Sequence, residues 1–324
     1  MNIEVSLGLW QDRPAAEVLD TARIADELGY PAVWIGEMAT YDAFALATAA
    51  GAAMRTSSLV LGPFAVQVRD PMMIAMGAAS VAALTGRPVQ VALGTSSTVV
   101  VEEWHGRARS APGAALEEAA EAVAPILAGG KSGFTGRQVG SRGYRLRLAA
   151  PGADLTIAAF GPRAIATAAR HAARMVVNLV DPTTAGELAE ALGEAANRIG
   201  RERPRVAAWI PTCVDPDAAA VDQIRRGVVG YLAAPGYSDM FERAGFAQVV
   251  EFARSRPHPR ELLAAIPDEL VFAVTAFGDR DAVLARLRAY EAAGVDDLVI
   301  VPACTDADPA AAHTLKTLAP GAGF

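Results

Sequence analysis

Residues 87–106 read RPVQVALGTSSTVVVEEWHG, an apolar run that leads directly into a loop of small hydroxylated residues. Val89, Val91 and Leu93 recur at every second position, which predicts a short β-strand. Gly94 ends the run with a residue that allows positive φ angles and close approach of the backbone. The TSST segment that follows, residues 95–98, offers hydroxyls and backbone N–H groups without bulky side chains. Where strands and helices alternate around a barrel, such loops line the active face, so this loop is a candidate ligand site; an ordinary polar turn is the alternative.

The same succession of strand and helix extends along the chain on both sides of this stretch. Apolar patterns predict strands at residues 3–9, 31–36, 59–68, 89–93, 155–160, 175–179, 206–214 and 298–301. Helical spacing predicts helices at residues 14–28, 43–54, 71–84, 114–127, 162–173, 185–199 and 281–293. Two intervals break the succession and are expected to be insertions, near 129–150 and 216–270. About eight β-α units predict an α/β fold, a single TIM (β/α)8 barrel domain over residues 1–324 with these insertions.

A doubly wound open sheet uses the same succession of elements and is the alternative fold. That fold usually carries a glycine-rich phosphate-binding turn after its first strand. Here the corresponding residues 10–14 read WQDRP and contain no glycine. The barrel is therefore the preferred prediction.

The composition and net charge of the chain limit the classes of molecule that it is expected to bind. The chain is 52% hydrophobic with a mean hydropathy of +0.25, yet no uninterrupted apolar run approaches the roughly 20 residues that span a bilayer. The first ten residues lack the pattern of a secretory signal, so the expected location is cytoplasmic. A net charge of −7 argues against nucleic acid or an anionic membrane as partner and favours a small-molecule substrate. Cys213 and Cys304 lack metal-ligand spacing and are expected to be buried thiols.

The predicted strand ends lack the side chains that several barrel chemistries require. Lys131 and Lys316 fall in an insertion and in the tail, which excludes a Schiff-base lysine at a strand end. The histidines fall in loops or helices without a His-x-His pair, so we expect no metal centre at the strand ends. No Gly-x-Ser-x-Gly nucleophile elbow is present. Such a site favours a bound cofactor that carries the chemistry, while the protein provides pocket and orientation.

A second loop has the features of a phosphate site. Residues 156–160 form an apolar strand, Gly161 follows it, and Pro162 opens a well-patterned helix. A helix start presents unpaired backbone N–H groups and the positive end of the helix dipole to an anion, and Arg163 can reach the same group. A glycine-proline helix start that binds nothing is the alternative. Together with the loop after Gly94, this segment favours a ligand that carries a phosphate.

Four segments carry a resemblance to a known family. They are IADELGYPAVWIGE (24–37), GTSSTVVVEEWHGR (94–107), AAFGPRAIATAARHA (158–172) and FGDRDAVLARLRAYEAAGVDDLVIVP (277–302). In these segments the chain resembles the luciferase-like monooxygenase superfamily, and within it the branch of oxidoreductases that use the deazaflavin coenzyme F420. The resemblance implies a TIM barrel with the cofactor ring at the mouth of the strands. It also implies F420 as the cofactor, with FMN as the alternative.

The resemblance further implies which residues hold the cofactor. Gly62, Phe64 and Ala65 would lie under the ring, and residues 94–97 beside it. A non-prolyl cis peptide bond within Phe64-Ala65-Val66 would support the ring from the third strand. The full set of implied cofactor-binding residues is Glu37, Gly62, Phe64, Ala65, Gly94, Thr95, Ser96, Ser97, Phe160, Gly161, Pro162, Arg163 and Ala164.

Two departures from the family pattern affect the expected chemistry. Many relatives follow the second strand with an acid-histidine pair, but here Glu37 precedes Met38, so the usual catalytic histidine is missing. Sugar-phosphate dehydrogenases of this branch carry a glutamate where this chain has Ser97, so glucose-6-phosphate oxidation by that scheme is not expected. Glu37, Glu102 and His105 remain as candidate acids and bases. The alternative for each is a structural role in its own loop.

The insertion at 131–148 is basic within an acidic chain. It contains no acidic residue and five basic ones, Lys131, Arg137, Arg142, Arg145 and Arg147. Coenzyme F420 has a polyglutamate tail and FMN has none, so basic residues near the mouth would favour F420. A solvated charged surface is the alternative.

These observations predict an oxidoreductase that transfers a hydride between F420 and a small unsaturated, carbonyl or imine-like substrate. One alternative is an FMN-dependent two-component monooxygenase, which would need a flavin reductase as partner. Another is a flavin-binding barrel without turnover, acting as a carrier or sensor. Exposed apolar faces on alanine-rich helices also indicate a homodimer or larger assembly.

Overall fold

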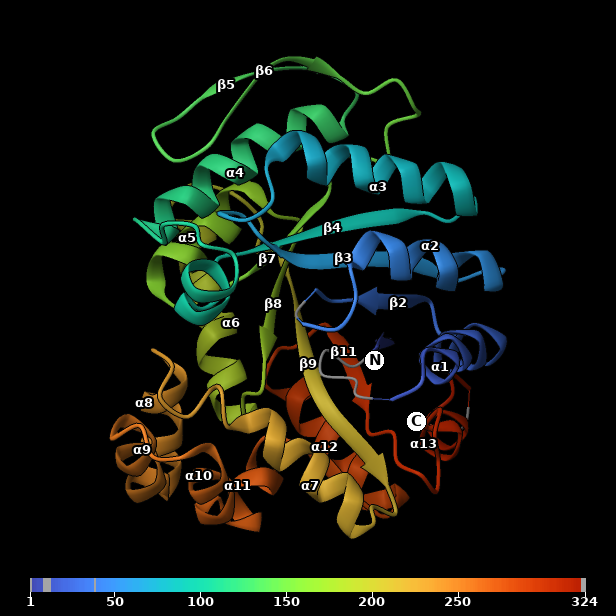
Figure 1. Ribbon diagram of the computed structural model, residues 1–324, viewed down its shortest axis with the longest axis vertical. Coiled ribbons are helices and arrows are strands. Elements are labelled where there is room, and N and C mark those ends of the chain that lie inside the picture. Colours follow the sequence, from blue (N-terminus) through green and yellow to red (C-terminus); the bar gives the residue numbers. More distant parts are fainter. Residues whose placement is uncertain (1, 8–12, 38, 322–324) are drawn as a thin grey trace.

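Parallel strands close into a barrel in the part of the chain that the computed structural model describes, residues 2–7, 13–37 and 39–321 (Figure 1). In their order around the barrel the strands are β1 (Asn2–Leu7), β2 (Ala32–Ile35), β3 (Ser58–Ala65), β4 (Val89–Gly94), β7 (Leu155–Ala158), β8 (Arg174–Asn178), β9 (Arg205–Val214) and β11 (Asp297–Pro302). The barrel is closed because β8 pairs with β9 and β11 pairs with β1. The predicted TIM barrel is therefore confirmed, and the open sheet, which would leave two unpaired edges, is excluded.

Helices cover the outside of the barrel, and all but the last of them connect one strand to the next (Figure 1). They are α1 (Ala15–Glu27), α2 (Ala43–Ala53), α3 (Pro71–Thr85), α4 (Pro112–Leu127), α5 (Pro162–His171), α6 (Pro182–Asn197), α12 (Arg280–Ala292) and α13 (Ala312–Thr317). All but α13 lie where the apolar periodicity predicts a helix. The ends of α3 follow from local chemistry, because Asp70 accepts the N–H of Met73 at 2.9 Å, Pro71 opens the helix, and Gly86 ends it with a φ of 68°. Within the described ranges, no helix combines the length and the apolar character needed to cross a membrane.

The two intervals expected to be insertions form a hairpin and a group of short helices. β5 (Lys131–Thr135) and β6 (Gly140–Arg145) pair in antiparallel fashion over the outer side of α3 and α4 (Figure 1). The second interval contains α7 (Ala218–Val228), α8 (Tyr237–Phe241), a π-helical segment (Glu242–Phe246), α9 (Ala247–Arg254), α10 (Pro259–Ala265) and α11 (Asp268–Ala273). A short strand, β10 (Ala276–Gly278), then adds to β9, and a π-helical turn (Val99–Trp104) follows β4. Neither is predicted from the sequence, because each is too short to show a periodic pattern.

β3 is irregular at its carboxyl end. Its register with β4 shifts between Leu61 and Phe64, and the cis peptide bond of the described chain is Gly62–Pro63. The expectation of a non-prolyl cis bond within residues 64–66 is therefore wrong. The cis bond lies earlier in the strand and is prolyl, and X–Pro bonds adopt the cis form far more readily than other peptide bonds. Glycine is required at position 62, because its φ is 104° and a Cβ would lie 2.4 Å from the carbonyl oxygen of Ala92.

Inward-facing side chains fill the barrel, while outward-facing ones pack against the helices. The inward cluster consists of Ala32, Trp34, Val60, Ala92, Val176, Ala207, Trp209 and Val299. The rings of Trp34 and Trp209 meet edge to face with their centroids 5.7 Å apart. Because the interior is filled, a ligand must bind at one end of the barrel. Cys213 and Cys304 are buried free thiols, as predicted, and burial raises the pKa of each to about 11.

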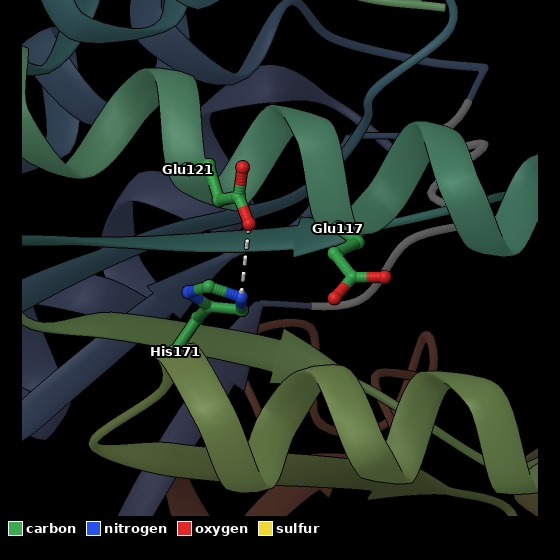
Figure 2. Close-up of side chains that lie close together, drawn as sticks. All are labelled: Glu117, Glu121 and His171. Atoms are coloured by element: carbon green, nitrogen blue, oxygen red, sulfur yellow. Dashed lines mark ion pairs between the residues drawn. The ribbon is translucent and has the colours of Figure 1, made fainter. Parts of the chain in front are cut away.

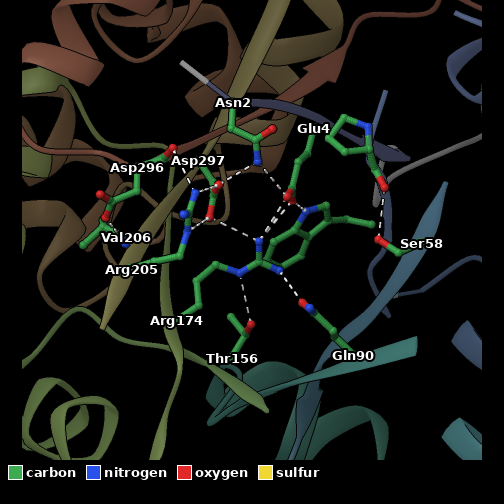
Figure 3. A network of polar contacts seen from close by, with 12 residues as sticks. Asn2, Glu4, Ser58, Gln90, Thr156, Arg174, Arg205, Val206, Asp296 and Asp297 are labelled. Atoms are coloured by element: carbon green, nitrogen blue, oxygen red, sulfur yellow. Dashed lines mark hydrogen bonds and ion pairs between the residues drawn. The ribbon is translucent and has the colours of Figure 1, made fainter. Parts of the chain in front are cut away.

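A network of charged side chains closes the amino-terminal end of the barrel (Figure 3). Arg174 donates to both carboxylate oxygens of Glu4 at 3.2 Å and to Asp297 at 3.3 Å. Its guanidinium carbon also lies 4.5 Å from the centre of the Trp34 ring. Burial by itself raises the pKa of Asp297, but the hydrogen bond from Arg205 and the charge of Arg174 outweigh it and hold that pKa below its usual value.

Asp26, near the end of α1, holds the turn that precedes β3. Its carboxylate accepts the backbone N–H groups of Arg55, Thr56 and Ser57 at 2.7–2.9 Å. Burial opposes ionisation of Asp26, but these hydrogen bonds outweigh it, and the pKa lies well below its usual value. A lowered pKa stabilises the fold only while the carboxylate is ionised, so we expect this contribution to be complete near pH 7 and to be lost progressively below about pH 5.

Asp26→Asn should lower the free energy of unfolding by about 1–3 kcal/mol at pH 7 and by a smaller amount at pH 3, where part of the contribution has been lost. The amide keeps one oxygen acceptor but turns an NH2 group toward backbone N–H donors. Urea denaturation at both pH values is the measurement. Asp20→Asn, on the exposed side of the same helix, is the control and should change little at either pH. An equal loss for Asp26→Asn at both pH values would contradict the assignment.

Candidate functional site

The carboxyl ends of adjacent strands bring together the two predicted ligand loops, the one after Gly94 and the one at Gly161. A Cβ added at Gly94 would lie 3.1 Å from the Cβ of Pro63 and 3.4 Å from the Cβ of Ala158, so β3, β4 and β7 meet at this point. β7 then leads to Gly161 and α5, which places the loop after Gly94 beside the predicted phosphate loop. The floor of the barrel mouth is therefore made of small side chains here, as a flat ring would require.

Phe64 and Ala65, both expected under the ring, differ in where their side chains lie. Phe64 is fully buried, and its ring packs against Phe44 of α2 with the centroids 4.8 Å apart. Only the backbone of Phe64 can therefore face the mouth. Ala65 pairs with Gly94 and is partly exposed. Of the two side chains, that of Ala65 is the one available to a ligand.

The loop after Gly94 is held by hydrogen bonds. Arg109 donates to the carbonyl oxygen of Ser96 at 2.9 and 3.2 Å, and the φ of Ser96 is 56°. The Ser97 hydroxyl accepts the N–H of Val100 at 3.2 Å, which starts the π-helical turn. Thr95 and Ser96 are partly exposed. A ligand can therefore reach Thr95 and Ser96, whereas the hydroxyl of Ser97 is engaged locally.

α5 begins as the phosphate prediction requires. Gly161 precedes it in an extended conformation, with φ −88° and ψ 163°, and no side chain caps the helix. Pro162 has no N–H, while the N–H groups of Arg163 and Ala164 are among the first of the helix and lack intrahelical acceptors. Residues 161–163 are exposed. This helix start can bind an anion through its N–H groups and its dipole.

The carboxylate of Glu37, just after the end of β2, forms an ion pair with an arginine. Arg69 donates to both oxygens of Glu37, at 2.8 Å for its Nε, and it also pairs with Asp42. The N–H of Ala43, at the start of α2, donates to Glu37 at 3.3 Å. These contacts fit the structural alternative for Glu37, a carboxylate tied to its neighbours. Nothing in the sequence pattern singles out Arg69, whose partners lie on another strand-helix unit.

Glu102 lies on the π-helical turn, His105 directly follows it, and both residues are exposed. The carboxylate of Glu102 accepts the N–H of Arg109 at 3.2 Å. The N–H of His105 donates to the carbonyl oxygen of Val100 at 3.2 Å and ends the turn. The carboxylate of Glu102 therefore has a local structural role in the loop that follows β4.

An aromatic cluster from the second insertion lies beside the phosphate loop. Phe160 packs on Tyr237 with the ring centroids 4.7 Å apart, and Tyr237 meets Tyr231 at 4.9 Å. The side chain of Asn178, the last residue of β8, lies close enough to both tyrosines to lower their pKa values slightly. Burial raises the pKa of both phenols, so they stay protonated and can donate hydrogen bonds at neutral pH. Phe160 is predicted from the sequence, but the other three residues are not, because they come from distant segments without a shared motif.

Trp209 carries a buried donor without a partner. The residue is 4% exposed, and its Nε1 has no hydrogen-bond partner within the described ranges. Its register partner on β8 is Asn178, beside the aromatic cluster. Buried N–H groups are rarely left unpaired, so this indole offers an unused donor inside the barrel. No signal in the sequence distinguishes Trp209 from an ordinary core tryptophan.

The basic hairpin lies along the outer side of α3 and α4, and its tip lies toward the mouth (Figure 1). Ser110, which precedes α4, donates to Gln138 at the tip at 2.9 Å. Arg137 therefore lies near the loop that follows β4. Lys131 and Arg145 pair at the opposite end of the hairpin. Only part of the positive charge of the insertion is thus near the mouth.

Known proteins similar to this chain share its length and fold. Residues 3–297 match the model of a family described as luciferase-like monooxygenase. A Mycobacterium tuberculosis protein named as a coenzyme F420-dependent oxidoreductase is 28% identical over 330 residues, which cover 93% of this chain and 94% of that protein.

Several solved structures share the fold of this chain. The coenzyme F420-dependent tetrahydromethanopterin reductase of Methanopyrus kandleri superposes with a TM-score of 0.82 and 19% identity over 98% of both chains. An F420-dependent secondary alcohol dehydrogenase with an F420-acetone adduct gives 0.81 and 16% identity over 100% of both chains. The oxygenating constituent of 3,6-diketocamphane monooxygenase from Pseudomonas putida, in complex with FMN, gives 0.71 and 17% identity over 98% of this chain and 97% of that one. At these identities the structural matches show a shared fold.

Proposed function

The chain belongs to the luciferase-like monooxygenase family, a family of oxidoreductases, and on that premise we propose that it transfers a hydride between coenzyme F420 and a small organic substrate. The observation that carries this proposal is the geometry of the mouth. A floor of small residues at Gly94 and Ala158 adjoins the uncapped start of α5. A flat ring with a phosphate on its side chain fits these two features together. The relative and two structural neighbours named for F420 support the choice of cofactor.

Different residues at the mouth would bind the ring and the phosphate of such a cofactor. The side-chain-free surface at Gly94 allows a ring to approach the backbone, and the N–H groups at the start of α5, together with Arg163, would hold the phosphate. Bound F420 supplies or accepts the hydride. The phenols of Tyr231 and Tyr237 would donate hydrogen bonds to a polar oxygen of the substrate. Both oxygens of the Glu37 carboxylate accept hydrogen bonds from Arg69.

The cofactor proposal is tested by titrating the purified protein with F420 and with FMN. We expect quenching of F420 fluorescence at micromolar concentration and weaker binding of FMN, because the phosphate loop and Arg137 favour a cofactor with further negative charge. Micromolar binding of FMN without binding of F420 would overturn the proposal. That result would favour an FMN-dependent monooxygenase with a flavin reductase as partner, as the FMN complex from Pseudomonas putida suggests.

We also propose a homodimer formed through α2 and α3. α2 and α3 lie side by side (Figure 1). They contain no charged residue, and Met72, Met73, Met76 and Leu84 are exposed on α3. Contiguous apolar surface marks a protein contact, and twofold pairing is its commonest form. Met76→Glu should convert a dimer to a monomer in light scattering, whereas Ile199→Glu, an exposed apolar position elsewhere, should not. A wild-type protein that is monomeric at micromolar concentration would refute the proposal.

A further inference from the structure

Two helices outside the barrel place three metal-ligating side chains together (Figure 2). Glu117 and Glu121 lie about one turn apart on α4, and His171 is the last residue of the neighbouring α5. One donor atom from each side chain lies within 4.8 Å of the other two. We propose that this group binds a divalent transition-metal ion such as zinc and thereby ties α4 to α5.

The imidazole of His171 is the feature that points to a ligand. Its Nε2 is buried and has no hydrogen-bond partner in the described part of the chain. The carboxylate of Glu121 lies 3.7 Å from this nitrogen, too far for a hydrogen bond. A buried imidazole nitrogen without a partner is the kind of donor that a metal ion binds.

The donor set decides the class of ion. One imidazole nitrogen with two carboxylates suits zinc and its first-row neighbours, whereas calcium and magnesium prefer oxygen donors alone. Zinc bonds of about 2.0–2.2 Å require the three donor atoms to move closer together than they are here. Glu117 and Glu121 can do so because their side chains are 34% and 42% exposed. Water would complete a tetrahedral site.

Arg170 competes with the metal ion for one ligand. Its guanidinium forms an ion pair with Glu117. Both partners of this pair reach solvent, so breaking it costs little. Glu117 can therefore bind either Arg170 or a metal ion. Removal of the arginine should strengthen the metal site.

The site is separate from the proposed cofactor site. His171 ends α5, whereas the phosphate would bind at Gly161, about 15 Å away along the helix. A metal ion here would connect two helices and stabilise their packing, and it would not touch a substrate at the mouth. The inference therefore does not depend on the identity of the cofactor.

The experiment is titration of the metal-free, full-length protein with Co²⁺ and Zn²⁺. We expect one Co²⁺ per chain, with a visible absorption band that Zn²⁺ removes, and a Tm that rises with zinc concentration. Glu121→Gln should weaken zinc binding by at least about tenfold, and His171→Ala by more. Arg170→Ala should tighten it. Glu121→Gln and Arg170→Ala change exposed side chains, so the test stands even if His171→Ala fails to fold.

His313→Ala is the matched control. It removes another histidine that contacts a carboxylate, that of Asp215 at 3.1 Å, on a different part of the surface. Zinc affinity should be unchanged in this variant. The proposal is overturned if the wild-type protein shows no stoichiometric Co²⁺ binding. It is also overturned if Glu121→Gln and Arg170→Ala bind zinc as the wild type does.

Discussion

Arg174→Met should lower the free energy of unfolding by about 3–5 kcal/mol. Arg174 pairs with Glu4 and Asp297, whose exposed fractions are only 5% and 1%. Methionine preserves much of the apolar stem, but it leaves Glu4 buried without a guanidinium partner among the described residues, while Asp297 keeps Arg205. An unpaired buried charge is costly because the desolvation of the carboxylate is no longer offset. Urea denaturation followed by tryptophan fluorescence measures the loss.

A second substitution tests the cause of this loss. In the Arg174→Met background, Glu4→Gln removes the unpaired charge and should restore part of the stability. The control is Arg23→Met on the exposed side of α1, which removes a surface ion pair with Glu27 and should cost less than about 1 kcal/mol. If Arg174→Met costs no more than Arg23→Met, the charges at this end of the barrel are hydrated and the network contributes little.

Gly94→Leu should weaken F420 binding by roughly 10- to 100-fold while the barrel stays folded. A Cβ at this position already lies 3.1 Å from Pro63 and 3.4 Å from Ala158. The remaining atoms of leucine would therefore have to enter the mouth, where the ring is proposed to lie. Gly94→Ala should have a smaller effect, because one methyl group needs only a shift of a few tenths of an ångström. Fluorescence titration with F420 measures the affinity, and far-UV circular dichroism checks the fold.

Gly133→Leu provides the matched control for this substitution. Gly133 lies on the exposed hairpin, and a Cβ there meets no atom within 4 Å. The affinity for F420 should be unchanged. Wild-type affinity in Gly94→Leu would mean that the ring does not lie over this strand, and the proposed binding mode would fail even if F420 is the cofactor.

The loops of the candidate site could be predicted because their signals are local. Gly161 and Pro162 are neighbours in the sequence, and the helix that they open is recognisable from its own periodicity. The role of Glu37 could not be predicted in this way. The sequence left open whether it is a polar group beside the ring or a tied carboxylate, and Arg69, on a different strand-helix unit, supports the second role.

The sequence by itself determined the order of strands and helices, and it also determined the family. Apolar periodicity, helix caps and sequence motifs are properties of short segments. Only the tertiary structure decided which polar groups meet. Barrel closure brings Glu4 to Arg174, the second insertion brings two tyrosines to Asn178, and the packing of α4 on α5 brings two glutamates to His171. Such encounters depend on strand register and helix packing between segments far apart in the chain, and no local pattern encodes them.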